Sequence, residues 1–247
     1  MEHAHVLCRG ITIGQHFSHQ RKVDGQIRAL RHADPRDHGQ QLRERRAAQQ
    51  ERSEQTRSDI LGIALEQFST RGFDAVSLRD IADAAGVNHA MIRYYFGNKE
   101  NLWRASVTQL FDRFMEGVAL PDPASDTFSI DAVKQYIRNY VRYCAAHPEH
   151  ARLMMQEANR DSERLKWMAE TFVRPRHDRS VPLVRYVSET TDGLARIDPV
   201  VLLYMITAIA QVPYLLTAEM RYAHGIDALD EKAIDAHCDA VVAFIFR

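Results

Sequence analysis

Side chains suited to non-covalent recognition of a polyanion are concentrated between residues 77 and 99. The main donors are Arg79, His89, Arg93, Tyr94 and Lys99. Arginine and histidine can reach base edges in a DNA groove, whereas tyrosine and lysine suit phosphate oxygens. The chain contains no G-x-S-x-G, P-loop, G-x-G-x-x-G or H-E-x-x-H motif. We therefore expect DNA recognition and no enzyme activity.

Two short helices joined by a tight turn would position these side chains. Ser77 is a predicted helix N-cap, because its hydroxyl can accept a bond from a free backbone N–H. Four apolar residues follow it at i, i+3, i+4 and i+7 of one helix face: Leu78, Ile81, Ala82 and Ala85. Gly86 then permits the left-handed backbone that ends a helix, and Asn88 caps a second helix, which carries Ile92 and Phe96 inward. This pattern predicts a helix-turn-helix.

The segment resembles the DNA-binding domain of the tetracycline-repressor (TetR) family of bacterial regulators. The similarity covers about residues 57–104. It includes the R-G-F end of the preceding helix and the run Y-F-G-N-K-E-N-L that starts at Tyr95, at unbroken spacing. We expect a DNA-binding head at 54–114 and a helical effector-binding and dimerisation body at 121–247. Sequences in this family diverge within the body.

The resemblance also implies which residues contact a double-stranded DNA operator. Carried over position by position, they are Ser77, Arg79, Asn88, His89, Ala90, Met91, Arg93, Tyr94, Tyr95 and Lys99. Met91 stands where the family commonly has serine or threonine, and Arg93 where tyrosine or asparagine is common. Arginine is the best guanine reader, so Arg93 is expected to set base specificity. The alternative is an ion pair between Arg93 and a carboxylate such as Asp83.

Two cations flank the predicted recognition helix. Lys99 begins the next helix, where a positive charge opposes the macrodipole, and a contact with a DNA phosphate would explain it. Arg57 lies near the start of a first helix expected at about residues 52–71. It is either a phosphate contact or a solvated surface residue.

The rest of the chain is helical in pattern, which predicts an all-α fold. Pro121-Asp122-Pro123 marks the start of the body, and Pro175 and Pro182 should kink or divide its third helix. The predicted helices are 129–147, one from Pro148, one from about 162 to 188, 199–222 and 230–246. The helix at 199–222 is apolar nearly all round, so it is predicted to be buried on all sides.

The last two helices carry more apolar surface than one body can cover. They would pair with their symmetry mates in a four-helix bundle, giving a homodimer. DNA geometry favours the same assembly, because two recognition helices must reach major grooves about 34–36 Å apart.

Family resemblance suggests that some methionine and aromatic side chains of the body line an effector cavity, although core packing explains such residues by default. The candidates are Phe111, Tyr140, Met155, Phe172 and Tyr204. His147 and His150 flank a proline near Glu149 and Glu157. We interpret the two histidines as a surface pair at a helix boundary, and we expect no metal site and no cofactor.

Residues 1–50 have poor apolar periodicity and hold six of the twelve histidines. They are predicted to be disordered or loosely helical. A metal-binding histidine cluster, or a basic arm at Arg43, Arg45 and Arg46, remains an alternative. Residues 1–104 hold 16 basic and 13 acidic side chains, and the rest hold 16 and 20, so the front half is mildly basic. Three widely spaced cysteines and the lack of a long apolar run predict a cytoplasmic protein without a membrane partner.

Together these patterns predict a transcriptional repressor that binds a palindromic operator as a dimer. A small apolar or amphipathic effector in the body would release it from DNA. The alternative is a helical small-molecule sensor or carrier that has lost operator binding.

Overall fold

The computed structural model describes residues 35–191 and 193–246, and every regular element in those ranges is helical, which confirms the all-α prediction. The chain divides into two units, residues 1–56 and 57–247, and helix α2 (Pro35–Arg71) has residues in both. Among the described residues, no single helix is long and apolar enough to cross a membrane.

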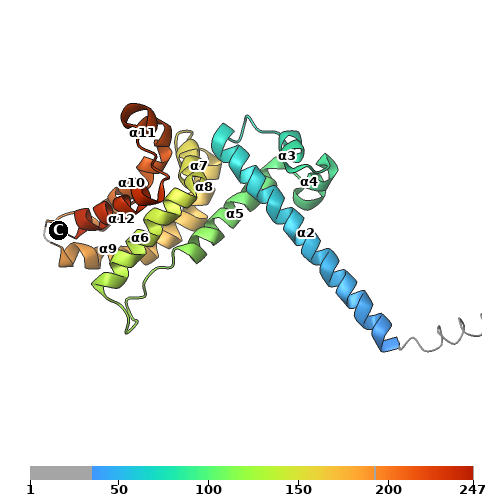
Figure 1. Cartoon of the computed structure of the whole chain (residues 1–247), viewed down its shortest axis with the longest axis horizontal. Helices are drawn as coiled ribbons and strands as arrows, with labels where there is room; N and C mark the ends of the chain where they lie inside the picture. The colour runs from blue at the N-terminus through green and yellow to red at the C-terminus, as the bar shows by residue number, and fades with distance from the viewer. Residues whose placement is uncertain (1–34, 192, 247) are drawn as a thin grey trace, which may run out of the picture. The chain divides into compact units, whose positions relative to one another are not determined.

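The described part of the first unit is the N-terminal portion of α2 (Figure 1). The helix begins at Pro35 rather than near residue 52, so residues 35–50 are helical. Good helix formers and i,i+4 pairs, such as Gln40 with Glu44 and Gln50 with Glu54, support it without an apolar stripe. Apolar periodicity alone therefore missed this segment. Residues 1–34, with five of the twelve histidines, lie outside the described residues.

The head of the second unit combines residues 57–71 of α2 with α3 (Leu78–Ala85), α4 (His89–Phe96) and the start of α5 (Lys99–Gly117). Its core consists of fully buried apolar side chains, among them Ile60, Phe68, Ile81, Ile92 and Trp103. Helix α5 continues from the head into the body, where it packs against α6 (Figure 1).

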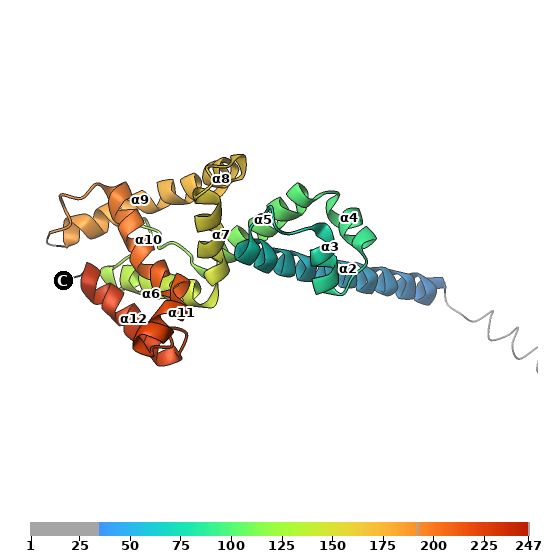
Figure 2. The same cartoon turned by 90° about the horizontal axis from the view of Figure 1, so that it is seen from above.

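The body contains seven more α-helices and one π-helical turn within the described ranges. They are α6 (Ile130–Ala146), α7 (Pro148–Ala158), α8 (Glu163–Met168), the π-helical turn Ala169–Val173, α9 (Arg174–Thr190), α10 (Pro199–Leu215), α11 (Thr217–His224) and α12 (Glu231–Ile245). Helix α6 packs against α10 and α12, α10 packs against α9, and α7 crosses from α6 to α8 (Figure 2). The π-helical turn ends two residues before Pro175, which cannot donate a backbone hydrogen bond. Pro182 lies inside α9.

The predicted helix at 199–222 is in fact two helices, α10 and α11, whose axes are bent by 65°. Pro213 lies in the last turn of α10 and leaves the carbonyl of Ile209 without its helical donor. His237 of α12 replaces that donor, since its Nε2 lies 3.0 Å from the Ile209 oxygen. Its Nδ1 then accepts a bond from the Tyr214 hydroxyl at 2.9 Å. Burial lowers the pKa of His237.

Burial of α10 on all sides is also wrong within one chain. Leu202, Ala210 and Tyr214 are buried, but large apolar side chains remain exposed along the opposite side. They are Val200, Val201, Tyr204, Met205 and Val212. Sequence hydropathy reports how apolar a helix is, and only the packing of its neighbours decides which side they cover.

Candidate nucleic-acid interface

Helix α3 begins with a complete capping box. The Ser77 hydroxyl accepts a bond from the Asp80 backbone N–H at 3.1 Å, and the Asp80 carboxylate accepts one from the Ser77 N–H at 2.7 Å. The same backbone bond lowers the pKa of Asp80. Two otherwise free amides are thereby satisfied, which fixes where α3 begins.

The turn between α3 and α4 adopts the backbone that its sequence predicts. Gly86 has φ of 63° and donates to the carbonyls of Ala82 and Asp83. The Asn88 side chain caps α4 by accepting a bond from the Ala90 N–H at 2.8 Å. Because caps and glycine fix both ends of the turn, the direction of α4 is set by local sequence.

Helix α4 buries Ile92 and Phe96, and predicted DNA-contacting residues lie on its other side. Those exposed to solvent are His89, Ala90, Met91, Arg93 and Tyr94. Tyr94 is the most open of them, at 84% exposure, and its ring lies 5.4 Å from that of the half-buried Tyr95. The outer face of α4 is therefore polar, aromatic and uncovered.

The Arg93 guanidinium has no ion-pair partner within residues 35–191 and 193–246, and Asp83 does not pair with it. Arg79 on α3 is also exposed and unpaired in that part of the chain. These two cations are therefore available to an external acceptor, which leaves the proposed base contact of Arg93 open.

Lys99 is held within the chain. Its ammonium lies 4.4 Å from the centre of the Phe73 ring and donates to the Asp74 carbonyl at 3.4 Å. Burial lowers its pKa. The contacts with the Phe73 ring and the Asp74 carbonyl thus explain why a lysine begins α5 despite the helix dipole. A DNA phosphate is not needed to explain it. Arg57 is exposed and lies 5.4 Å from the centre of the Phe96 ring.

The five predicted effector contacts do not gather in one place. Phe111 and Phe172 stack with ring centres 4.5 Å apart, while Tyr140 belongs to a second core and accepts a bond from Gln211 at 2.9 Å. Met155 and Tyr204 are 53% and 57% exposed. Of the five residues, only Phe111 and Phe172 are in contact with each other. Tyr140 lies in the second core, and Met155 and Tyr204 lie on the open sides of α7 and α10.

The histidine pair at the α6–α7 boundary is not a surface pair. His150 is buried among the rings of Phe111, Phe114 and Tyr143, and the Tyr143 hydroxyl lies 3.2 Å from its Nδ1. Burial lowers the pKa of His150 to about 3. A neutral imidazole is therefore part of the body core, while the half-buried His147 lies nearer the surface.

Sequence reasoning missed two groups of polar side chains. Arg176 is half-buried in the body, where it donates to the Val118 carbonyl at 2.6 Å and lies 4.8 Å from the centre of the Phe114 ring. At the junction of head and body, Gln156 donates to the Ser69 carbonyl at 2.6 Å and Arg160 pairs with Asp74 at 2.6 Å. These contacts join segments far apart in sequence, so no local pattern indicates them.

Comparison with known proteins gives two matches to family models. Residues 60–105 match the model described as bacterial regulatory proteins, tetR family. Residues 117–247 match the model described as YcdC-like protein, C-terminal region. The two matches cover the head and the body in turn.

Similar individual proteins include two named regulators. The HTH-type transcriptional regulator RutR of Escherichia coli is 35% identical over 98 residues, which are 40% of this chain and 45% of RutR. The IcaR protein of Staphylococcus epidermidis, named as a negative transcriptional regulator of the biofilm operon icaADBC, is 30% identical over 82 residues, 33% of this chain and 43% of IcaR. The chain thus spans less than half the length of these curated relatives. Among solved structures, a HlyIIR variant with a replaced segment aligns over 74% of this chain and 97% of its own, with a TM-score of 0.56 and 25% identity.

Proposed function

The chain belongs to the tetR family of bacterial regulatory proteins, and on that basis we propose that it is a repressor that binds a specific DNA operator as a dimer and is released by a small molecule. The observation that carries the proposal is the outer face of α4. It presents the exposed Tyr94 and Arg93, an arginine without an ion-pair partner in the described part of the chain, on a helix whose start is fixed by a side-chain cap. Such a regulator would work in the cytoplasm, where bacterial DNA lies.

In this proposal α4 enters the major groove as the second helix of a helix-turn-helix. Arg93 would donate two bonds to one guanine, because its guanidinium is exposed and has no partner in the described chain. Arg79, Ser77 and Arg57 would position the head by contacting phosphates. Met91 supplies an apolar surface that suits a thymine methyl group.

The exposed apolar side of α10 supports a homodimer. Val201, Met205, Ala208 and Val212 recur at intervals of four, three and four residues, so they form one exposed stripe. A groove of about 490 Å³ lies beside the stripe, lined by Ile209, Ala240, Val241, Ala243 and Phe244. A second copy of the same surface would fill the groove with its own side chains and remove the stripe from water.

The small side chains that line this groove allow a partner helix to come close. Ala240 and Ala243 allow the backbone of a neighbouring helix to approach α12, while the half-exposed Phe244 offers a large ring. Val241, in contrast, is buried inside its own chain. A charge placed at Val241 would therefore damage the core, so tests of the interface belong at Val212 instead.

A gel-shift assay on DNA taken from upstream of the protein's own gene tests the proposal. We expect a retarded complex that unlabelled specific DNA removes and random DNA of equal length does not. Arg93→Ala should weaken the complex with specific DNA and leave the binding of random DNA unchanged. The matched control is Arg185→Ala, at an exposed arginine on α9. If the wild-type protein binds both DNAs equally, the alternative of a small-molecule sensor without an operator is favoured.

A further inference from the structure

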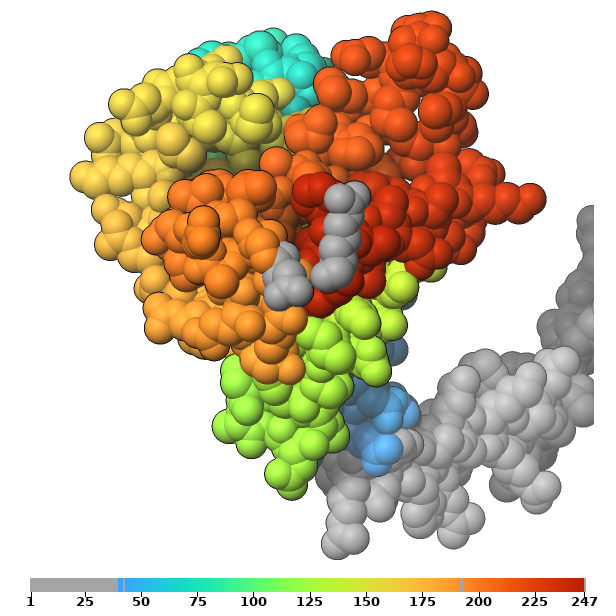
Figure 3. All heavy atoms as spheres, turned by 90° about the vertical axis from the view of Figure 1, so that its left-hand side faces the viewer, coloured from blue at the N-terminus to red at the C-terminus, as the bar shows by residue number. Residues whose placement is uncertain are grey.

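Helix α8 belongs to the body in sequence, yet it packs with the core of the head. Met168 of α8 and Leu153 of α7 are buried in the same cluster as Trp103 of the head. The ring of Trp167 on α8 lies 5.7 Å from that of Trp103, measured between ring centres. Figure 3 shows α7 in yellow with residues of the head in cyan behind it. Helix α8 is therefore a further supporting helix of the head.

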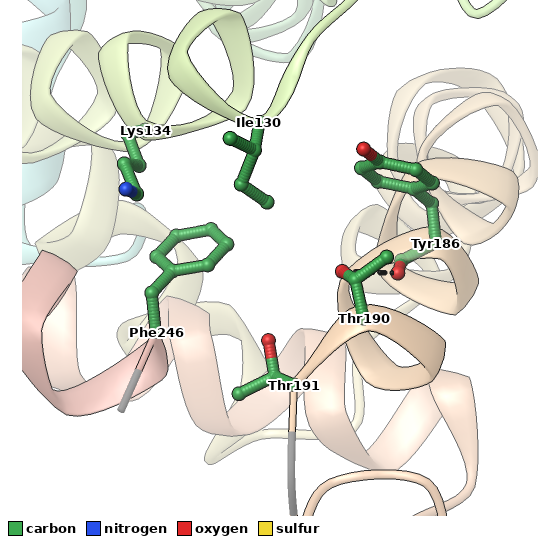
Figure 4. A pocket seen from close by; sticks show the side chains of 6 residues that line it. All are labelled: Ile130, Lys134, Tyr186, Thr190, Thr191 and Phe246. Carbon is green, nitrogen blue, oxygen red and sulfur yellow. Dashed lines mark hydrogen bonds between the residues drawn. The ribbon is translucent and has the colours of Figure 1, made fainter.

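Helix α9 packs with the other core. Its buried Val187 lies in a cluster with residues of α6, α10 and α12. Near its end, Tyr186 lines a pocket together with Ile130 of α6 and Phe246, which follows α12 (Figure 4). The π-helical turn Ala169–Val173 connects the two helices, so it separates a segment held by the head from a segment held by the body. Turns of this kind are frequent at functional sites.

A buried ion pair holds Arg164 of α8 against the head. The central carbon of its guanidinium lies 3.9 Å from the centre of the Phe73 ring. Its Nε donates at 3.2 Å to the carboxylate of Glu157, which is 2% exposed and accepts a second bond from the Ser162 hydroxyl at 2.6 Å. Because the carboxylate is itself fixed by a second donor, the guanidinium is held in place over the ring.

Two more side chains of this segment hold the backbone on either side of that ring. Gln156 donates to the Ser69 carbonyl at 2.6 Å, and Arg160 donates to the Asp74 carboxylate at 2.6 Å. These bonds fix the end of α2 and the turn that follows it. The turn leads directly to Ser77, the cap of α3. Its position therefore determines where α3 and α4 begin.

The turn between α7 and α8 has a strained backbone. Asp161 has φ of 47° and is the one non-glycine residue of the described ranges with a positive φ. A left-handed backbone is unfavourable for a residue with a side chain, and it persists where the surrounding contacts over-determine it. Here it sets Arg160 and Arg164, on either side of Asp161, against the same turn of the head.

We propose that Arg164 is a positioning residue for DNA recognition. By holding Phe73 it fixes the turn before α3, and with it the orientation of α4 relative to the body. The inference rests on the proposed function, in which two heads bind two half-sites at one spacing. A fixed orientation presents both recognition helices at that spacing before DNA binds. A loose head must instead be ordered on binding, which costs affinity.

Binding of the full chain to operators of different half-site spacing tests this role. The operator is the specific DNA found by gel shift, and its altered versions carry one or two extra base pairs between the half-sites. Wild-type protein should bind the altered versions about tenfold more weakly or worse, because its heads are fixed at one spacing.

The test variant combines Arg164→Met with Glu157→Gln. It keeps an apolar chain over Phe73, removes the cation and leaves no buried carboxylate without its partner. We expect its affinity for the natural operator to fall by about fivefold or more, with little change on the altered versions, because preorganisation is lost. Discrimination between the spacings should fall by the same factor.

Three further variants complete the comparison. Arg164→Lys keeps a cation over Phe73 and should restore most of the discrimination. Gln156→Ala combined with Arg160→Ala loosens the same turn from outside the buried ion pair and should reduce discrimination in the same direction. Arg185→Met, at an exposed arginine of α9, is the matched control and should behave as wild type. Circular dichroism establishes that each variant is folded.

Two failures are distinguishable. If wild-type protein binds no specific DNA, the proposed function fails and this inference fails with it. If wild-type protein binds a specific operator but the folded variants at Arg164 and at Gln156 and Arg160 discriminate between spacings as well as it does, the positioning role alone is refuted.

Discussion

The outer faces of α4 and α10 are both uncovered, but their chemistry is opposite. Helix α4 presents His89, Arg93 and Tyr94, whose polar groups remain hydrated in the absence of a partner. Helix α10 presents Val201 and Val212, and leaving apolar area in water costs about 25 cal/mol per Å². Solvent therefore tolerates the α4 face and favours covering the α10 face. The α4 face therefore suits a polyanion that binds reversibly, whereas the α10 face suits a partner that stays bound.

The largest expected effect comes from placing a charge on the α10 face. Val212→Glu should convert the proposed dimer to a monomer, because a carboxylate buried between two apolar surfaces has no partner there. Specific DNA binding should be lost with the dimer, while circular dichroism stays that of a folded helical protein. Light scattering gives the mass, and Arg185→Glu on the outside of α9 is the control. A dimeric Val212→Glu protein with normal DNA binding would show that α10 is not the interface.

On the α4 face, Arg93→Ala should weaken operator binding by about 1–3 kcal/mol and relax the preference at one base pair, as loss of a bidentate base contact does. The dimer should be unaffected. Selection from a randomised site measures the base preference. If that preference is unchanged in the variant, Arg93 does not read a base.

Substitution of His237 tests whether its two hydrogen bonds stabilise the end of α10. His237→Leu would leave the Ile209 carbonyl and the Tyr214 hydroxyl without their partner, so we expect the free energy of unfolding to fall by about 1–2 kcal/mol. Thermal or urea unfolding measures it, and His224→Leu, at an exposed histidine of α11, is the control. Equal losses in the two variants would contradict a structural role for His237.

The same histidine predicts a pH dependence. Burial lowers the pKa of His237 in the folded chain, so below the ordinary histidine pKa of about 6.5 the unfolded chain binds the proton more readily. Stability should therefore fall as the pH is lowered from 7 to 5, and His237→Leu should make that fall shallower. An unchanged slope in the variant would exclude His237 as a contributor.

The smallest effect is expected at Lys99, whose ammonium packs against the Phe73 ring and also carries a charge that would attract a DNA phosphate. Lys99→Met keeps a long apolar chain against Phe73 and removes the charge. If the ammonium also reaches a phosphate, binding to all sequences should weaken alike, and the slope of log affinity against log salt should decrease by about one. An unchanged salt slope would assign Lys99 to head packing alone.

The sequence predicted the head well, because its signals are local. Ser77, Gly86 and Asn88 each fix the backbone within a few residues, and the structure has all three at helix ends. The body was predicted as helical, but its exposed and buried faces were not. Burial of His150, exposure of Tyr204 and the contacts of the half-buried Arg176 depend on neighbours that are distant in sequence. Apolar content alone could not distinguish an α10 buried in its own chain from one with an open side.

We propose that the open side of α10 joins two heads into one DNA-binding unit. Light scattering of the wild-type protein at micromolar concentration tests it most directly. We expect a single species with twice the 28.3 kDa mass of the chain. A stable species of 28.3 kDa under those conditions would contradict both the interface and the two-headed mode of operator binding.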